Sequence, residues 1–153
     1  MKPNLQKNAK YRQGIFKPRN PNKFLGSTAI YRSGLELKFM RFCDENTNIL
    51  KWGSENITIP YISPIDGRAH RYFVDNFVLI KEGDTAKRYL VEIKPSRQTA
   101  APTTKYKKKT NLLYEQAMFA VNTAKWEAAR EFCKKNNATF LILTEKELGE
   151  CNN

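Results

Sequence analysis

Two stretches with the hydrophobic period of an α-helix enclose three runs typical of β-strands, and this order constrains the fold more than any other feature of the sequence. Short polar segments separate the three runs, which predicts an antiparallel meander. The sequence therefore predicts an α/β domain with a mixed central sheet, in the order helix, three-stranded antiparallel meander, helix, strand. The expected elements are a helix from Ser33, strands at 56–62, 71–80 and 89–93, a helix from Asn111 to the Asn136-Asn137 pair, and a strand at 138–144. We also expect a turn near Trp52-Gly53, a basic loop at 96–110, and a short polar helix or tail from Glu145.

The two expected helices differ in their apolar faces. Ser33 is expected to cap the first helix, and Glu36 three residues later completes the S-x-x-E pattern of a capping box. The apolar stripe of this helix consists of Leu35, Phe39, Phe42 and Cys43. On the second helix the expected apolar face consists of Leu112, Leu113, Ala117, Ala120, Ala124, Ala128 and Phe132.

The composition is that of one folded domain, because 41% of the 153 residues are hydrophobic and 27% are charged. We expect residues 1–25 to form a basic N-terminal arm and residues 26–153 to form the domain. The candidate anchors of the arm to the domain are Tyr11, Ile15, Phe16 and Phe24. The apolar run at 140–143 is far shorter than a membrane-spanning helix, and no apolar signal segment follows the basic N-terminus. These features predict a soluble protein without membrane contact.

Cysteine and histidine are too few and too scattered for several kinds of chemistry. Cys43, Cys133 and Cys151 predict neither a disulfide framework nor a zinc site, in keeping with a reducing cytoplasm. His70 is the only histidine, which excludes catalysis by two histidines of one protomer. A metal site would therefore depend on carboxylate and carbonyl oxygens, the ligands that Mg²⁺ and Mn²⁺ prefer.

The net charge of +12, from 27 Lys and Arg against 15 Asp and Glu, predicts a polyanionic partner. The excess is concentrated in residues 1–35 and 96–110, two stretches without any acidic residue. Either stretch alone is equally consistent with solvated surface or a flexible arm. Because the two stretches flank the candidate site described next, phosphate binding is the stronger interpretation.

Two acidic residues and a lysine form a candidate site on the predicted meander. Residues i and i+2 of a strand point to the same face, so Glu92 and Lys94 are expected to project side by side. By the same rule Asp75 shares a face with Phe73 and Phe77, where an ionised carboxylate needs compensation. If the second and third strands are neighbours, the two carboxylates can share one divalent cation. A cation held in this way can activate water and offset charge on a phosphate during hydrolysis.

Each of these residues also has a structural interpretation. An E-x-K pair on a strand is a common surface salt bridge, and Asp75 could be a core carboxylate satisfied by hydrogen bonds. Glu36 is explained equally by the capping box and by metal coordination, and both interpretations stay open. The combination of an acid in an aromatic strand, a polar turn and the run VEIKP at 91–95 is more specific than any of its parts.

Three segments in order, YRSGLE at 31–36, HRYFVD at 70–75 and VEIKP at 91–95, resemble the motifs of the PD-(D/E)xK nuclease superfamily. Within that superfamily the chain looks like the TnsA-type endonucleases, and most closely like the head-completion nucleases of large tailed phages. The likeness runs from Tyr11 to Phe140. Val74 stands where the proline that gives the superfamily its name is found, a change that leaves the following acid in place.

The resemblance implies a DNA endonuclease of restriction-endonuclease-like fold that depends on Mg²⁺, with Mn²⁺ as a substitute. Asp75 and Glu92 match the metal-binding acids, and Lys94 matches the catalytic lysine. Glu36 matches the acid of the first helix that completes the metal site, directly or through water.

Two further site residues and a DNA-binding surface follow from the same reasoning. The main-chain carbonyl of Ile93 matches a metal ligand, and Gln116 matches a glutamine near the site on the second helix. We expect phosphate contacts without base reading. The predicted DNA-binding residues are Arg32, Arg71, Arg97, Lys105, Lys107, Lys108 and Lys109.

The function that the resemblance implies is the trimming of packaged DNA ends during phage head completion, in the host cytoplasm or as part of the virion. The partners would be DNA and capsid, portal or neck proteins. Two other functions are compatible with the sequence: a noncatalytic DNA-binding or head-plugging protein, and a TnsA-like recombination nuclease within a larger complex. Clustered carboxylates favour an enzyme, because binding to a polyanion has no use for them.

Overall fold

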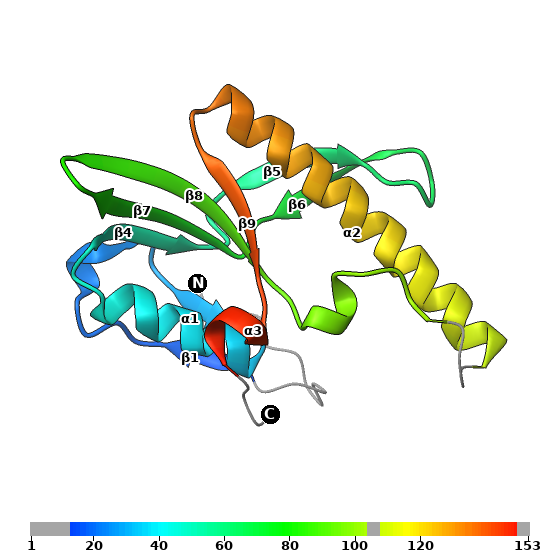
Figure 1. The fold of residues 1–153 in the computed structure, drawn as a ribbon, viewed down its shortest axis with the longest axis horizontal. Coiled ribbons are helices and arrows are strands. Elements are labelled where there is room, and N and C mark those ends of the chain that lie inside the picture. The colour runs from blue at the N-terminus through cyan, green and yellow to red at the C-terminus, as the bar shows by residue number, and fades with distance from the viewer. Residues whose placement is uncertain (1–12, 104–107, 150–153) are drawn as a thin grey trace.

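A five-stranded mixed sheet organises the domain in the computed structural model, which describes residues 13–103 and 108–149 (Figure 1). The strand order is β2-β4-β7-β8-β9. Strands β4, β7 and β8 are antiparallel neighbours, whereas β2 and β9 join β4 and β8 in parallel. The predicted fold class is confirmed. The strands are β2 (Phe24–Leu25), β4 (Ile49–Ser54), β7 (Asn76–Glu82), β8 (Thr85–Ile93) and β9 (Thr139–Leu143).

Two long helices, α1 (Gly34–Glu45) and α2 (Lys109–Lys135), pack against two different cores. Alternate residues of β8 point to opposite faces of the sheet. Val91 and Ile93 therefore belong to the α1 core, and Leu90 belongs to the α2 core. Glu92, two residues after Leu90, therefore has its side chain on the same α2 side of the sheet.

Residues 13–25 of the predicted arm lie on the domain. Strand β1 (Gly14–Phe16) pairs antiparallel with β3 (Ala29–Tyr31), and Phe16 and Phe24 pack against the α1 core. A short 3₁₀ helix, η1 (Pro21–Lys23), connects β1 to β2. Residues 1–12, including the predicted anchor Tyr11, lie outside the described residues.

The C-terminus of α1 holds this segment in place. The buried carboxylate of Asp44 accepts hydrogen bonds from the backbone N–H groups of Arg19 (2.9 Å) and Asn20 (3.0 Å). The Lys23 ammonium donates to the carbonyls of Cys43, Asp44 and Asn46 at 2.7–3.0 Å. These contacts satisfy carbonyl groups that a helix end leaves without partners.

The prediction of a turn near Trp52-Gly53 was wrong, because these residues lie within β4. Trp52 is fully buried, and a side chain at Gly53 would meet the Asn56 side chain at 2.6 Å. Glycine here therefore permits close packing and does not mark a turn. The meander consists of β4, β7 and β8, and the predicted strand at 56–62 belongs elsewhere.

The run at 56–62 contributes β5 (Thr58–Ile62), which pairs with β6 (Ala69–Phe73) in a separate two-stranded sheet. The predicted strand at 71–80 is consequently broken at Val74 and Asp75, between β6 and β7. The Val74 N–H donates to the Ile57 carbonyl (3.1 Å), and the Asp75 carbonyl accepts from the Glu55 N–H (3.0 Å). Asp75 thus lies in a bend between two sheets, and Phe73 is exposed, so the predicted shared face of Phe73, Asp75 and Phe77 was wrong.

The bounds predicted for the second helix agree with α2, and Ala128 and Phe132 of the predicted apolar face pack against the α2 core. The rest of the predicted face does not form the buried face of the helix. The residues that α2 buries are Asn122, Trp126, Ala129 and Cys133. Leu113 and Ala120 on the predicted face are exposed. Burial of an indole ring and a thiol removes more apolar surface from water than burial of alanine methyl groups, and this decides the orientation.

The chain beyond β8 and β9 forms two short helices. The predicted basic loop at 96–110 begins with a 3₁₀ helix, η2 (Ser96–Gln98), and the predicted polar helix after the last strand is α3 (Glu145–Leu148), capped by Thr144. Across residues 13–103 and 108–149, no helix is both long and apolar enough to cross a membrane.

We expect Asp44→Ala to lower the free energy of unfolding by about 2–4 kcal/mol, because two backbone N–H groups lose a charged acceptor. Urea denaturation followed by tryptophan fluorescence measures this change. The exposed Glu127→Ala is the matched control, with an expected effect within about 0.5 kcal/mol. Equal stability of Asp44→Ala and the control would contradict the role of Asp44.

Candidate active site

Asp75 and Glu92 meet at the end of the β7–β8 ladder. Asn76 pairs with Val91, so one further step of the register places Asp75 opposite Glu92. The Ile93 N–H donates to Asp75 Oδ2 at 2.8 Å. Burial raises the pKa of Asp75 well above its ordinary value, and the adjacent Glu92 carboxyl raises it further as a like charge and a hydrogen-bond partner. The two predicted acids therefore lie together.

Glu92 is 4% exposed and faces α2. Its Oε2 accepts a hydrogen bond from the Trp126 indole N–H at 3.2 Å. The hydroxyl of Tyr72 is buried without a hydrogen bond of good geometry to any described residue. Burial raises the pKa of Tyr72, and the charges of Glu92 and Asp75 raise it further, which places this hydroxyl beside the acid pair. Tyr72 and Trp126 were not predicted from the sequence.

Two lysines lie beside the acid pair. Lys94 follows the last residue of β8, and its N–H donates to the Leu143 carbonyl at 3.0 Å. Lys125 of α2 lines the same pocket as Lys94. Burial lowers the pKa of Lys125, the Glu92 carboxylate raises it, and Lys94 lowers it as a like charge. Lys125 was also missed, because its place on the site-facing side of α2 depends on the orientation of the helix.

Glu36 is engaged in capping α1. Its N–H donates to Ser33 Oγ (3.1 Å), as the capping box predicts. Its carboxylate, however, accepts from the N–H of Arg32 (2.6 Å), one residue before the N-cap. Burial raises the pKa of Glu36, hydrogen bonds at Arg32 and Ser33 offset part of this rise, and the charges of Glu55 and Glu92 add to it. Glu36 is thus close enough to the acid pair to sense its charge.

The acid pair fits a hard divalent cation by the chemistry of its donors. A divalent cation relieves the repulsion between two adjacent carboxylates. The other ligands of Mg²⁺ are commonly water and carbonyl oxygens. In the part of the chain that the structure describes, no three His, Cys, Asp or Glu side chains are arranged to hold a metal. Direct coordination by Glu36 would require its carboxylate to leave the cap, and the Ile93 carbonyl stays a predicted ligand.

The three predicted arginines have different surroundings. Arg97 lines the pocket with Lys94. Arg32 pairs with Glu55 at 3.3 Å, and the exposed Arg71 lies over the Phe73 ring at 5.6 Å.

Helix α2 carries the rest of the predicted residues that the structure describes. Gln116 is exposed and does not line the pocket, whereas Asn122 of the same helix does. Lys108 and Lys109 are exposed at the N-terminus of α2. The predicted contacts Lys105 and Lys107 lie outside the described residues.

The domain has a restriction-endonuclease-like fold. Its elements are a helix, an antiparallel meander with acids at the end of one ladder, a second helix and a parallel strand. Residues 46–145 match the family described as TnsA-like endonuclease N terminal. The chain is also 36% identical over 143 residues to the head completion nuclease of Enterobacteria phage T4, a similarity that covers 88% of this chain and 92% of that protein. The chain belongs to the TnsA-like endonuclease family.

We expect Asp75→Asn to stabilise the metal-free protein at pH 7.5. When folding raises the pKa of a carboxyl, the folded state loses stability as the pH rises. The loss begins near the pKa of the unfolded chain, about 4, and continues until the pH reaches the pKa of the folded state. Asparagine keeps an acceptor for the Ile93 N–H and has no such penalty. Thermal unfolding in EDTA should show a higher Tm for the variant, by about 2–4 °C per kcal/mol in a domain of this size, and the gain should shrink toward pH 4.

The matched control for this measurement is Asp84→Asn in the exposed turn between β7 and β8. Its Tm should follow that of the unmodified protein at every pH. Addition of Mg²⁺ should raise the Tm of the unmodified protein and of the control, but not that of Asp75→Asn. A lower Tm for Asp75→Asn in EDTA at neutral pH would contradict the proximity of the two acids.

Proposed function

We propose that this protein is a Mg²⁺-dependent DNA endonuclease that hydrolyses phosphodiester bonds during phage head completion. The observation that carries the proposal is the pairing of Asp75 with the buried Glu92 beside two lysines. A structural role alone does not explain a carboxyl in contact with the buried Glu92 carboxyl, because each makes the ionisation of the other less favourable. A surface that only held DNA would gain nothing from them.

Each residue of the site has a role in the proposed reaction. Asp75 and Glu92 would hold Mg²⁺, for which Mn²⁺ can substitute, and the bound ion would supply an activated water and a counter-charge for the phosphate. The Ile93 N–H and the Trp126 indole fix the orientation of the two carboxylates. Lys94 would stabilise negative charge that develops on the scissile phosphate.

A role in head completion rests on the relative from phage T4, which is named for that role and is similar over nearly its whole length. The substrate would be a protruding end of packaged DNA, and the site of action would be the host cell, where heads are assembled. The positive charge of the chain fits this substrate, since contacts to phosphates need no particular base sequence. Head or neck proteins would bring the enzyme to the DNA end.

We expect purified protein to convert supercoiled plasmid to nicked and linear forms in Mg²⁺ or Mn²⁺, and to lose this activity in EDTA. Asp75→Asn and Lys94→Met should each lower the rate by about 100-fold or more, because each removes charge stabilisation at the reacting phosphate. Gel electrophoresis of timed samples measures the rates. Lys81→Met, an exposed lysine on β7, is the control with an expected rate near that of the unmodified protein.

Intact plasmid after incubation with the unmodified protein in either metal would overturn the proposal. If the protein still bound DNA in Ca²⁺, the noncatalytic DNA-holding function would take its place. Equal rates for Lys94→Met and Lys81→Met would remove Lys94 from the mechanism and leave the acid pair unaffected.

A further inference from the structure

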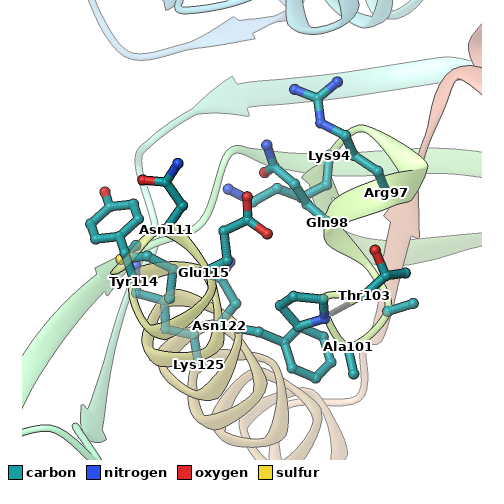
Figure 2. Close-up of a pocket in the computed structure, with 14 residues that line it drawn as sticks. Lys94, Arg97, Gln98, Ala101, Thr103, Asn111, Tyr114, Glu115, Asn122 and Lys125 are labelled. Atoms are coloured by element: carbon teal, nitrogen blue, oxygen red, sulfur yellow. The ribbon is translucent and has the colours of Figure 1, made fainter. Parts of the chain in front are cut away.

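The pocket beside the acid pair has a volume of about 1150 Å³ and lies between α2 and the segment that follows β8 (Figure 2). Residues from Lys94 to Thr103 line one side of it. The N-terminal and middle turns of α2, from Asn111 to Lys125, line the other side. Lys94 and Lys125 both line the pocket, and Lys125 is close enough to Asp75 and Glu92 to sense their charges, so the pocket adjoins the candidate active site.

The charge of the lining favours an anion. Lys94, Arg97 and Lys125 carry positive charge, and Glu115 is the one acidic residue among those that line the pocket. Lys125 is partly buried and lies 5.6 Å from the centre of the Tyr72 ring, so its ammonium is held at the inner part of the α2 face. A chain of phosphates that entered the pocket would meet cations from both of its sides.

The same lining offers apolar and amide groups to a base. Tyr114 is 68% exposed and Met118 is 40% exposed, although both lie on the side of α2 that faces the pocket. Figure 2 shows that amide side chains also come from both sides, with Gln98 on η2 and Asn122 on α2. Aromatic side chains for stacking combined with a cationic groove are the features by which proteins bind unpaired nucleic-acid strands.

The size of the pocket favours a single strand over double-stranded DNA. A sphere of 1150 Å³ is about 13 Å across. The two grooves of B-DNA, about 8.5 Å and 7.5 Å deep, together span more than this distance. A few nucleotides of one strand therefore fit the pocket better than a duplex does.

We propose that this pocket binds unpaired nucleotides of a DNA strand, with Tyr114 stacking on a base and Lys125 contacting a phosphate next to the one that is cut. The inference rests on the proposed nuclease function and specifies its substrate: a frayed, forked or single-stranded end. A strand that left the pocket past Lys94 would approach the acid pair.

Fluorescence anisotropy with a labelled 12-nucleotide oligothymidylate in Ca²⁺ tests the proposal, with a blunt hairpin duplex as the second ligand. Tyr114→Ala should weaken binding of the oligothymidylate by about fivefold or more, the loss of one stacked base. Its affinity for the blunt duplex should stay unchanged. Leu113→Ala removes a side chain that is 57% exposed on the adjacent residue and does not line the pocket, so it serves as the matched control.

Lys125→Gln should lower the affinity for the oligothymidylate and reduce the slope of log K against log salt by about 0.7, the contribution of one phosphate contact to a single strand. Lys134→Gln, an exposed lysine in the last turn of α2, should leave both quantities unchanged. Equal loss of oligothymidylate and duplex binding in Tyr114→Ala, or an unchanged slope in Lys125→Gln, would overturn the proposal.

Binding and cleavage are measured separately, so the two proposals can fail independently. A protein that cuts plasmid in Mg²⁺ but does not bind the oligothymidylate would refute the pocket and keep the nuclease. With a forked duplex as substrate in Mg²⁺, Tyr114→Ala should cut at the fork more slowly than Leu113→Ala does. Equal rates for the two variants at the fork would also refute the pocket.

Discussion

Asp75 and Glu92 repel each other, and the surrounding structure nevertheless holds them together. The Ile93 N–H binds one carboxyl, the Trp126 indole binds the other, and burial withholds the water that would screen them. Burial raises the pKa of Asp75, and repulsion from Glu92 raises it further, so without a cation retention of a proton relieves the repulsion. Such an unfavourable arrangement is typical of functional sites, where residues needed for activity lower the stability of the fold.

The break between β6 and β7 makes this arrangement possible. Had the chain continued as one strand, Asp75 would have been paired within a single sheet. Because β5 and β6 instead form their own hairpin, they provide a second surface for α2. Trp126 of α2 belongs to one core cluster with Ile59 of β5 and Tyr72 of β6. The hairpin lies beside α2 (Figure 1) and thus sets its position. Helix α2 in turn places Trp126 and Lys125 beside the acids.

Local rules predicted the residues of the site better than their surroundings. Alternation along a strand placed Glu92 beside Lys94, and antiparallel pairing placed Asp75 against Glu92, because both rules depend only on backbone geometry. The face of α2 could not be predicted in this way, since the burial of Trp126 is decided by tertiary packing and by its hydrogen bond to Glu92. Trp52-Gly53 has the composition of a turn, and only the close approach of Asn56 explains the glycine.

Access to the acid pair, more than base recognition, would determine which DNA is cut. The net charge of +12 attracts any DNA, so differences in affinity alone cannot protect the packaged duplex from cleavage. Glu92 is buried on the α2 side of β8, and the adjoining pocket suits one strand better than two. A paired region would have to open before its backbone reached Lys94, and opening costs stacking energy that a frayed end has already lost. An enzyme built in this way would cut protruding or unpaired ends and leave the duplex beside them intact.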